Sequence, residues 1–264
     1  MSTSARIGAL VMRHIYLLQK SKARMVELAF WPTFEIVLWG FFSVYLAQMN
    51  GANSMAAKFI LGAAVLWCAL SRGGAAMMIS FMEEMWSRNL GHIFVSPIRS
   101  WEFIAGIIVV SSLRTAVGVA IAVLASVLLF SDVLISQGPV LLMHFSMLLV
   151  MSWSFGLISM GMILRWGNSA EWLTWMILFG IMPVCCVYFP LSALPHWLQV
   201  IALGLPAAHV FEGMRHVLAT GDTGWSYLGW ALGLNIVWLS LTFAFAMNCL
   251  SHARKHASLV QQGE

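Results

Sequence analysis

Apolar residues run through most of this chain in long continuous stretches that short polar segments interrupt. A helix needs about 20 mostly apolar residues to cross the hydrocarbon core of a bilayer. Continuous runs of this kind differ from the alternating segments of about 10 residues that form a transmembrane β-barrel. The pattern therefore predicts an all-α integral membrane protein with six spans, of which the fifth is short and contains Pro183, so that a broken helix is the alternative there. The predicted spans cover residues 26–48, 55–81, 103–130, 140–164, 172–189 and 226–249.

The segment before the first span is amphipathic. Four apolar positions recur at helical spacing, and three basic positions recur every seventh residue on another face. A helix of this kind lies in the headgroup plane with its basic stripe toward anionic lipid. We therefore expect an interfacial helix over residues 4–22, with a short solvated lead-in as the alternative. The apolar positions are Ile7, Val11, Ile15 and Leu18, and the basic positions are Arg6, Arg13 and Lys20.

A second amphipathic pattern covers residues 83–96, between the second and third spans. Glu84 precedes Arg88 by one helical turn, so the two side chains can pair, and a proline directly after the segment ends the helix. Short connections would tie this helix to both spans, so a force on it would reach the membrane domain. An ordinary loop helix is the alternative interpretation. The apolar face consists of Met82, Trp86, Leu90, Ile93 and Phe94.

A third unusual segment, residues 190–221, is apolar but is interrupted by proline and glycine. A straight spanning helix would lose backbone hydrogen bonds at each proline. Irregular backbone at membrane depth is tolerated only where protein or water satisfies it. We expect a re-entrant pair of short helices near residues 196–202 and 207–219, with Gly221 as the C-terminal stop. The interrupting residues are Pro190, Pro195, Gly204 and Pro206.

Composition supports the membrane assignment. The chain has 264 residues, of which 61% are hydrophobic and 9% charged, and its mean hydropathy is +0.86. An average soluble domain is about 45–50% apolar and about 25% charged. A net charge of +4 is too small to indicate a nucleic-acid partner. The cysteines lack the CxxC spacing of a zinc site and are expected as small core side chains; they are Cys68, Cys185, Cys186 and Cys249.

The basic residues predict the orientation of the chain. Lysine and arginine near span ends concentrate on the cytoplasmic side. With six spans, ten basic residues fall on the side of the termini and two on the opposite side, so both termini are expected in the cytoplasm. The ten are Arg6, Arg13, Lys20, Lys22, Arg24, Arg88, Arg99, Arg165, Arg254 and Lys255, and the two are Lys58 and Arg215.

Three charged residues, Glu35, Arg72 and Arg114, fall inside predicted spans. A central charge costs roughly 2.5–3.5 kcal/mol on insertion scales, so such residues face a bundle interior or a cavity. Glu35 and Arg114 are candidates for pairing with each other or for lining a polar route, and the residues alone favour neither. Glu212 and Arg215 are three residues apart in the 207–219 helix, so they are expected to pair.

The sequence has no GxxxxGK[ST] phosphate loop, HExxH or GxSxG, and no GxGxxG in a plausible strand context. Paired acids on a soluble face and metal-ligand clusters are missing too. We therefore expect no catalytic, cofactor-binding or metal site in this chain. Transport against a gradient would need ion coupling or a partner that supplies energy.

Three stretches resemble the permease subunits of type-two ABC exporters, which export capsule polysaccharide, O-antigen, teichoic acid and several drugs. Residues 83–106, EEMWSRNLGHIFVSPIRSWEFIAG, resemble that family's coupling helix and the start of its third span. Residues 189–195, FPLSALP, resemble its outer FPLSxLP motif. Residues 205–215, LPAAHVFEGMR, resemble its NPxxHVxExxR helix, with Leu205 where asparagine is usual.

The resemblance implies a homodimer in the bacterial cytoplasmic membrane, docked on two copies of a separate ATP-binding subunit that binds ATP and Mg. The single membrane domain 1–264 would export a lipid-linked glycan, a lipid-like molecule or a hydrophobic drug, in contact with membrane lipids. Glu35 and Arg114 would meet the substrate or stabilise the bundle. An ATPase-independent secondary transporter or channel and a membrane scaffold are the alternatives. Coupling residues would be Glu83, Glu84, Trp86, Arg88 and Leu90, and outer-gate residues Pro190, Pro195, Pro206, His209, Glu212 and Arg215.

Overall fold

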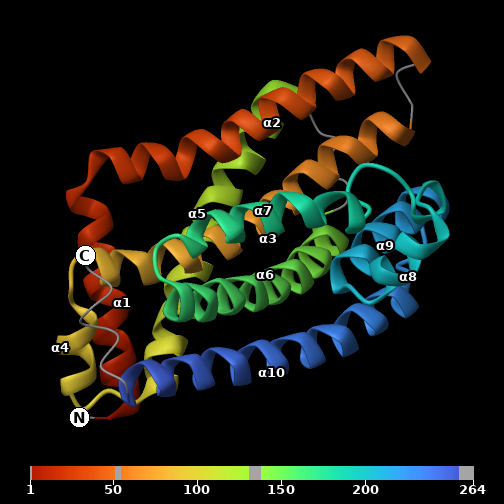
Figure 1. Cartoon of the computed structure of the whole chain (residues 1–264). Helices are drawn as coiled ribbons and strands as arrows, with labels where there is room; N and C mark the ends of the chain where they lie inside the picture. Colours follow the sequence, from red (N-terminus) through yellow and green to blue (C-terminus); the bar gives the residue numbers. More distant parts are fainter. Residues whose placement is uncertain (1, 51–54, 131–137, 256–264) are drawn as a thin grey trace.

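The computed structural model describes residues 2–50, 55–130 and 138–255, with the backbone alone described at Asn50, 55–58, Phe94 and 138–140. The described residues form α-helices and one short 3-10 helix, η2, with no strand among them (Figure 1). The helices are α1 (Thr3–Lys20), α2 (Lys22–Asn50), α3 (Met55–Trp86), α4 (Leu90–Val95), α5 (Ser100–Phe130), α6 (Gly138–Trp166), α7 (Ala170–Val184), η2 (Leu191–Ala193), α8 (His196–Leu203), α9 (Pro206–Thr220) and α10 (Trp225–Lys255).

Five of these helices are long and apolar enough to cross a membrane, and this supports a multi-pass membrane protein. They are Lys22–Met49, Phe59–Trp86, Ser100–Phe130, Leu141–Trp166 and Trp225–Lys255. Their positions agree with five of the six predicted spans.

The fifth predicted span, 172–189, is only partly helical. Helix α7 has 15 residues, which is about 22 Å and less than the thickness of the hydrocarbon core. Pro183 lies in its last turn, and Cys186 follows with a φ of 58°, in the left-handed region. The chain therefore turns at 185–189 and reaches η2 and α8 instead of continuing the helix.

Helix α3 is the centre of the bundle. In the 18-residue apolar stretch of α3, 89% of the residues are buried, whereas the corresponding share is 17% in α2 and 22% in α10. Small residues let a neighbouring helix approach α3 closely. A Cβ atom added to Gly73 would lie 2.7 Å from the Cβ of Ser152 on α6, too close for an ordinary contact. Helices α2 and α10, by contrast, expose large apolar side chains such as Phe30, Phe41 and Ile236, which suits contact with lipid.

The two ends of the bundle differ. Helices α1 and α4 and the C-terminal end of α10 lie at one end, which we call the α4 end, and α8 and α9 lie at the other (Figure 1). The predicted short helices 196–202 and 207–219 are present as α8 and α9. Gly221 caps α9 with a φ of 75°, as its position at the end of the amphipathic pattern predicts.

The predicted helix 83–96 is not one helix. Helix α3 continues to Trp86, Arg88 adopts a φ of 52°, and α4 is a separate helix of 6 residues. Leu90 and Ile93 on α4 are buried in the cluster that contains Met82, so the predicted apolar face packs inward. The side chain of Phe94, which was assigned to the same face, lies outside the described residues, as do that of Lys58 and the segments 51–54, 131–137 and 256–264.

Candidate functional site

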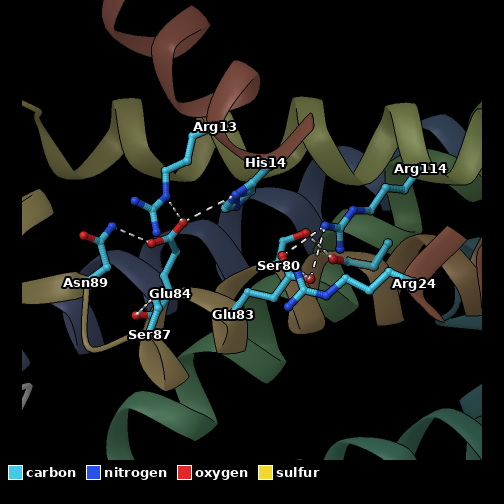
Figure 2. A network of polar contacts seen from close by, with 10 residues as sticks. Arg13, His14, Arg24, Ser80, Glu83, Glu84, Ser87, Asn89 and Arg114 are labelled. Carbon is cyan, nitrogen blue, oxygen red and sulfur yellow. Dashed lines mark hydrogen bonds and ion pairs between the residues drawn. The ribbon is translucent and has the colours of Figure 1, made fainter. Parts of the chain in front are cut away.

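A buried ion-pair network lies at the α4 end, where the last turn of α3 meets α1, α2 and α5 (Figure 2). Its first centre is Glu83. The Arg114 side chain on α5 donates to Glu83 Oε2 over 3.0 Å, and Arg24 Nη1 on α2 lies 3.4 Å from Glu83 Oε1. Only 3% of the Glu83 side chain is exposed. One carboxylate therefore joins three helices through two guanidinium groups.

The second centre is Glu84, whose side chain is fully buried. Arg13 on α1 donates to Glu84 Oε1 over 2.9 Å, and Asn89 donates to Oε2 over 2.7 Å. His14 Nδ1 lies 3.4 Å from the same Oε1. Glu84 thus ties α1 to the junction between α3 and α4, and Figure 2 shows these side chains converging on its carboxylate.

Glu102, in the first turn of α5, is a third buried carboxylate that binds α1. Arg6 donates to Glu102 Oε1 through Nε over 3.1 Å and through Nη2 over 2.6 Å. The backbone N–H of Arg99 donates to Glu102 Oε2 over 2.9 Å. The predicted stripe of Arg6, Arg13 and Lys20 therefore does not face lipid as a whole, since its first two members bind carboxylates of the protein. A buried carboxylate needs a paired cation, and α1 supplies it.

His14 is a buried histidine of α1 that packs beside this network, with 2% of its side chain exposed. Burial lowers the pKa of His14 below its ordinary value, and the Glu84 carboxylate offsets part of that effect. One turn before His14, the apolar side chain of Leu10 packs on α5. A Cβ atom added to Gly106 of α5 would lie 3.1 Å from Leu10 Cδ1. Helix α1 is thus attached by both charge pairs and apolar packing.

The five residues assigned to coupling occupy two different environments. Glu83 and Glu84 are buried in the ion-pair network, and Leu90 is buried with 3% exposure. Trp86 is 56% exposed, and Arg88 is exposed at the turn between α3 and α4. The one-turn helical spacing on which the Glu84–Arg88 pair was based does not exist, because α3 ends at Trp86.

Of the two alternatives left open for Glu35 and Arg114, their pairing with each other does not occur. Arg114 binds Glu83, and Glu35 Oε1 instead lies 3.8 Å from Arg72 Nη2 on α3. Cys68 Sγ donates to Glu35 Oε2 over 3.0 Å. The physical reason is helix register: Glu35 faces the middle of α3, whereas Arg114 is level with its last turn.

The residues assigned to an outer gate meet at the other end of the bundle. Glu212 and Arg215 form the predicted pair at 2.7 Å, and Glu212 Oε1 also accepts from the backbone N–H of Leu191 over 2.7 Å. Arg215 donates to the carbonyl oxygens of Cys186 and Val187. These contacts hold α9 against the turn that follows α7.

The remaining gate residues end or begin helices in this region. Pro190 and Pro195 are the N-cap residues of η2 and α8, and Pro206 is the first residue of α9. His209 Nε2 lies 2.9 Å from the carbonyl oxygen of Leu203, and its ring stacks on Trp230 with centroids 6.2 Å apart. The prolines set the turns, and His209 joins α9 to α8 and α10.

A cavity of about 290 Å³ lies next to the ion-pair network. Sequence reasoning did not find it, because its walls come from helices far apart in the chain. The sequence feature that could have indicated the cavity is the pair Arg24 and Arg72, which both line it. Sequence analysis treated Arg24 only as a charge that flanks the first span and Arg72 only as a charge inside the second. The lining residues are Leu18, Arg24, Glu27, Leu28, Trp31, Pro32, Arg72, Ala75, Ala76, Ile79, Glu83, Trp86, Arg114, Thr115, Gly118, Glu171 and Trp175.

Comparison with known proteins adds no assignment: no protein-family model matches the chain, and no curated protein matches it either. The fold and site by themselves define a class, namely an all-helical, multi-pass membrane protein with a buried charge network at one end.

Proposed function

We propose that this chain is the transmembrane permease subunit of an ATP-driven ABC exporter that moves an amphipathic substrate outward. The substrate class is a lipid-linked glycan, a lipid-like molecule or a hydrophobic drug. The α4 end would face the cytoplasm of a bacterial inner membrane, and two copies of the chain would dock on two copies of an ATP-binding subunit. That partner would bind ATP and Mg.

The observation that supports this proposal is the ionic attachment of the α3–α4 junction to three other helices. Glu83 binds Arg24 and Arg114, and Glu84 binds Arg13. A load applied at α4 would therefore reach α1, α2 and α5 together, since buried pairs with short contacts resist separation. A mechanical input at this junction suits a permease driven by a second protein.

The exposed side chains at the same junction suit a docking surface. Trp86 is 56% exposed and Val95 is 91% exposed, and both lie at the ends of the short connection between the two long helices α3 and α5. Exposed apolar side chains at the end of a span and in the connection that follows it are typical of protein contacts. We assign Trp86, Arg88 and Val95 to contact with the ATP-binding subunit, and Glu83, Glu84 and Leu90 to force transmission inside the chain.

At the opposite end, the proposal assigns the Glu212–Arg215 pair and the prolines of η2, α8 and α9 to an outer gate. Release of the Arg215 contacts with the turn after α7 would let α8 and α9 move away from α7. Glu35 and Arg72 lie between the two ends and would stabilise the bundle or contact the substrate.

The test is copurification of an ATP-binding subunit with this chain from the membranes that contain it. Trp86→Ala and Arg88→Gln are expected to lower the retained ATPase several-fold, because they remove exposed contacts at the junction. Trp197→Ala is the matched control, since Trp197 is 66% exposed on α8 at the other end of the bundle. The proposal predicts normal ATPase retention by this control.

A secondary transporter is the second candidate, and the observation that favours it is the intramembrane carboxylate Glu35 beside Arg72. Vesicles that contain the purified chain alone separate the two functions. Uphill flux that depends on a proton or sodium gradient, without any ATPase, would refute the ABC permease proposal and support the secondary transporter.

A further inference from the structure

The cavity beside the ion-pair network has one end at the α3–α4 junction and the other deeper in the bundle. Trp86 and Glu83 line the first end, and Arg72 lines the second. Arg72 precedes Glu83 by eleven residues on α3, which is about 16 Å along a helix. At about 290 Å³, the space is of the size that holds a small ligand or a headgroup.

Three guanidinium groups line this space, and they are not equally satisfied. Arg24 and Arg114 both contact Glu83, so that carboxylate is already held between two cations. Arg72 has a weaker partner, because its Nη2 lies 3.8 Å from Glu35 Oε1. The Nε atom of Arg72 is buried and has no hydrogen-bond partner among the residues that the structure describes.

The partly exposed terminal nitrogens of Arg72 favour an anionic ligand, because the Nη2 contact with Glu35 is long, at 3.8 Å. A guanidinium group presents donors in a planar fork that matches the oxygens of a phosphate or carboxylate. Among the described residues, Glu83 pairs with Arg24 and Arg114, and neither Glu27 nor Glu171 forms an ion pair with Arg72. Glu27 and Glu171 also line the cavity, and they supply acceptors for hydroxyl groups on the same ligand.

The apolar part of the lining indicates that the ligand carries a tail. Trp31 on α2 and Trp175 on α7 line the cavity together with Leu28 and Ile79. Trp31 is 45% exposed, and the Arg72 guanidinium lies over its ring at 5.9 Å. An indole at this position contacts an apolar chain on one side and a polar headgroup on the other.

We infer that this cavity binds the headgroup of an anionic amphiphile, a hydroxyl-bearing phosphodiester whose phosphate binds Arg72 and whose apolar tail lies along Trp31 and Trp175. As a statement about transported substrate, this inference rests on the proposed function. As a statement about binding chemistry, it applies equally to a resident phospholipid of the bilayer.

Lipid retention by the purified full chain tests the inference. We would place the protein in phosphatidylcholine nanodiscs that contain phosphatidylglycerol, and count bound lipids by native mass spectrometry. Wild type is expected to retain phosphatidylglycerol, and Arg72→Gln to lower that retention about tenfold, the effect of losing a charged hydrogen bond. Arg165→Gln is the matched control, because Arg165 is exposed at the end of α6 and does not line the cavity.

Two further measurements keep the inference falsifiable if Arg72→Gln does not fold. Ala76→Leu narrows the cavity without touching a charge, and it should also lower phosphatidylglycerol retention. Wild type alone should prefer phosphatidylglycerol over a trimethylammonium lipid of the same chain length. Equal retention of the two lipids, or equal phosphatidylglycerol retention in the folded Arg72→Gln and Arg165→Gln variants, would overturn the inference.

Competition with single-chain lysophosphatidylglycerol distinguishes the two sources of ligand. Rapid displacement of the bound lipid supports a site on a transport route, and slow or no displacement supports a resident lipid. The assay contains no ATPase, so a failure to retain phosphatidylglycerol would reject the proposed lipid site but would leave the permease proposal intact. If the cavity retains phosphatidylglycerol but no ATP-binding subunit copurifies with the chain, the lipid site is supported and the permease proposal is refuted.

Discussion

Arg114 on α5 donates a hydrogen bond to Glu83 on α3 over 3.0 Å, and the two side chains are only 9% and 3% exposed. The pair joins the two long helices that flank α4, at the level where Arg24 on α2 reaches the same carboxylate. A displacement of α3 at this level therefore moves α5 and α2 with it.

Breaking this pair on one side should destabilise the protein strongly. Glu83→Ala leaves Arg114 and Arg24 without their shared carboxylate, and loss of one partner of a buried pair costs about 3–5 kcal/mol. The free energy of unfolding of the purified protein in mild detergent measures the effect. Glu171→Ala is the control, because Glu171 is half-buried and is expected to cost much less. Replacing both Glu83 and Arg114 by methionine should recover much of the loss, and no recovery would show that the pair is not the cause.

Docking of α1 should weaken in acid. The folded-state pKa of His14 lies below its ordinary value of 6.5, chiefly because of burial, so the folded protein favours the neutral ring. The unfolded chain binds the proton more readily, so this contribution is present above about pH 6.5 and is lost as the pH falls. The protection factors of the amides along α1, which are corrected for the intrinsic slowing of exchange in acid, should therefore fall as the pH drops below about 6.5.

Two histidine variants test whether His14 causes this pH dependence. His14→Gln should flatten the pH dependence of the α1 protection factors, whereas His92→Gln, at an exposed position of α4, should leave it unchanged. A profile that persists in His14→Gln would assign the titration to another group. The charged residues that act on His14 are Glu84, Arg114, Glu83 and Arg13.

Close packing between α3 and α6 should make Gly73 intolerant of a side chain. The added Cβ of Gly73→Ala would lie 2.7 Å from Ser152 Cβ, which forces a shift of one helix and costs roughly 1–3 kcal/mol. The unfolding midpoint in detergent measures this cost. Gly180→Ala on α7 meets nothing within 4 Å and should be neutral or slightly stabilising. Ser152→Gly in the Gly73→Ala background should restore the midpoint if the clash is the cause.

The turn after α7 should open when Arg215 loses its carbonyl contacts. Arg215 donates to the oxygens of Cys186 and Val187, and the Cys186 thiol is fully buried. In a background with Cys68 and Cys249 replaced by alanine, Arg215→Gln should raise the rate of maleimide labelling at 185–186 roughly tenfold, by lowering the free energy of local opening. Arg99→Gln, an exposed arginine at the opposite end, is the control. Unchanged labelling in Arg215→Gln would show that these contacts do not close the turn.

Local patterns in the sequence located most elements correctly. Continuous apolar runs predicted α2, α3, α5, α6 and α10, and the spacing of Glu212 and Arg215 predicted their pair. Gly221 ended α9 where the amphipathic pattern stops. Each of these features depends on residues within a few turns of one another, so the chain alone carries the information.

The tertiary structure decided which charges meet. Glu35 and Arg114 both lie inside apolar runs, yet they bind different partners because the rotation and level of α2 and α5 against α3 determine which faces oppose each other. The same packing buried Glu83 and Glu84 against arginines of α1, α2 and α5, which removed them from the surface on which a helix over 83–96 would have placed them. Hydropathy reports how apolar each segment is, but a buried charge is stabilised by one particular cation, and only the assembled bundle places that cation within reach.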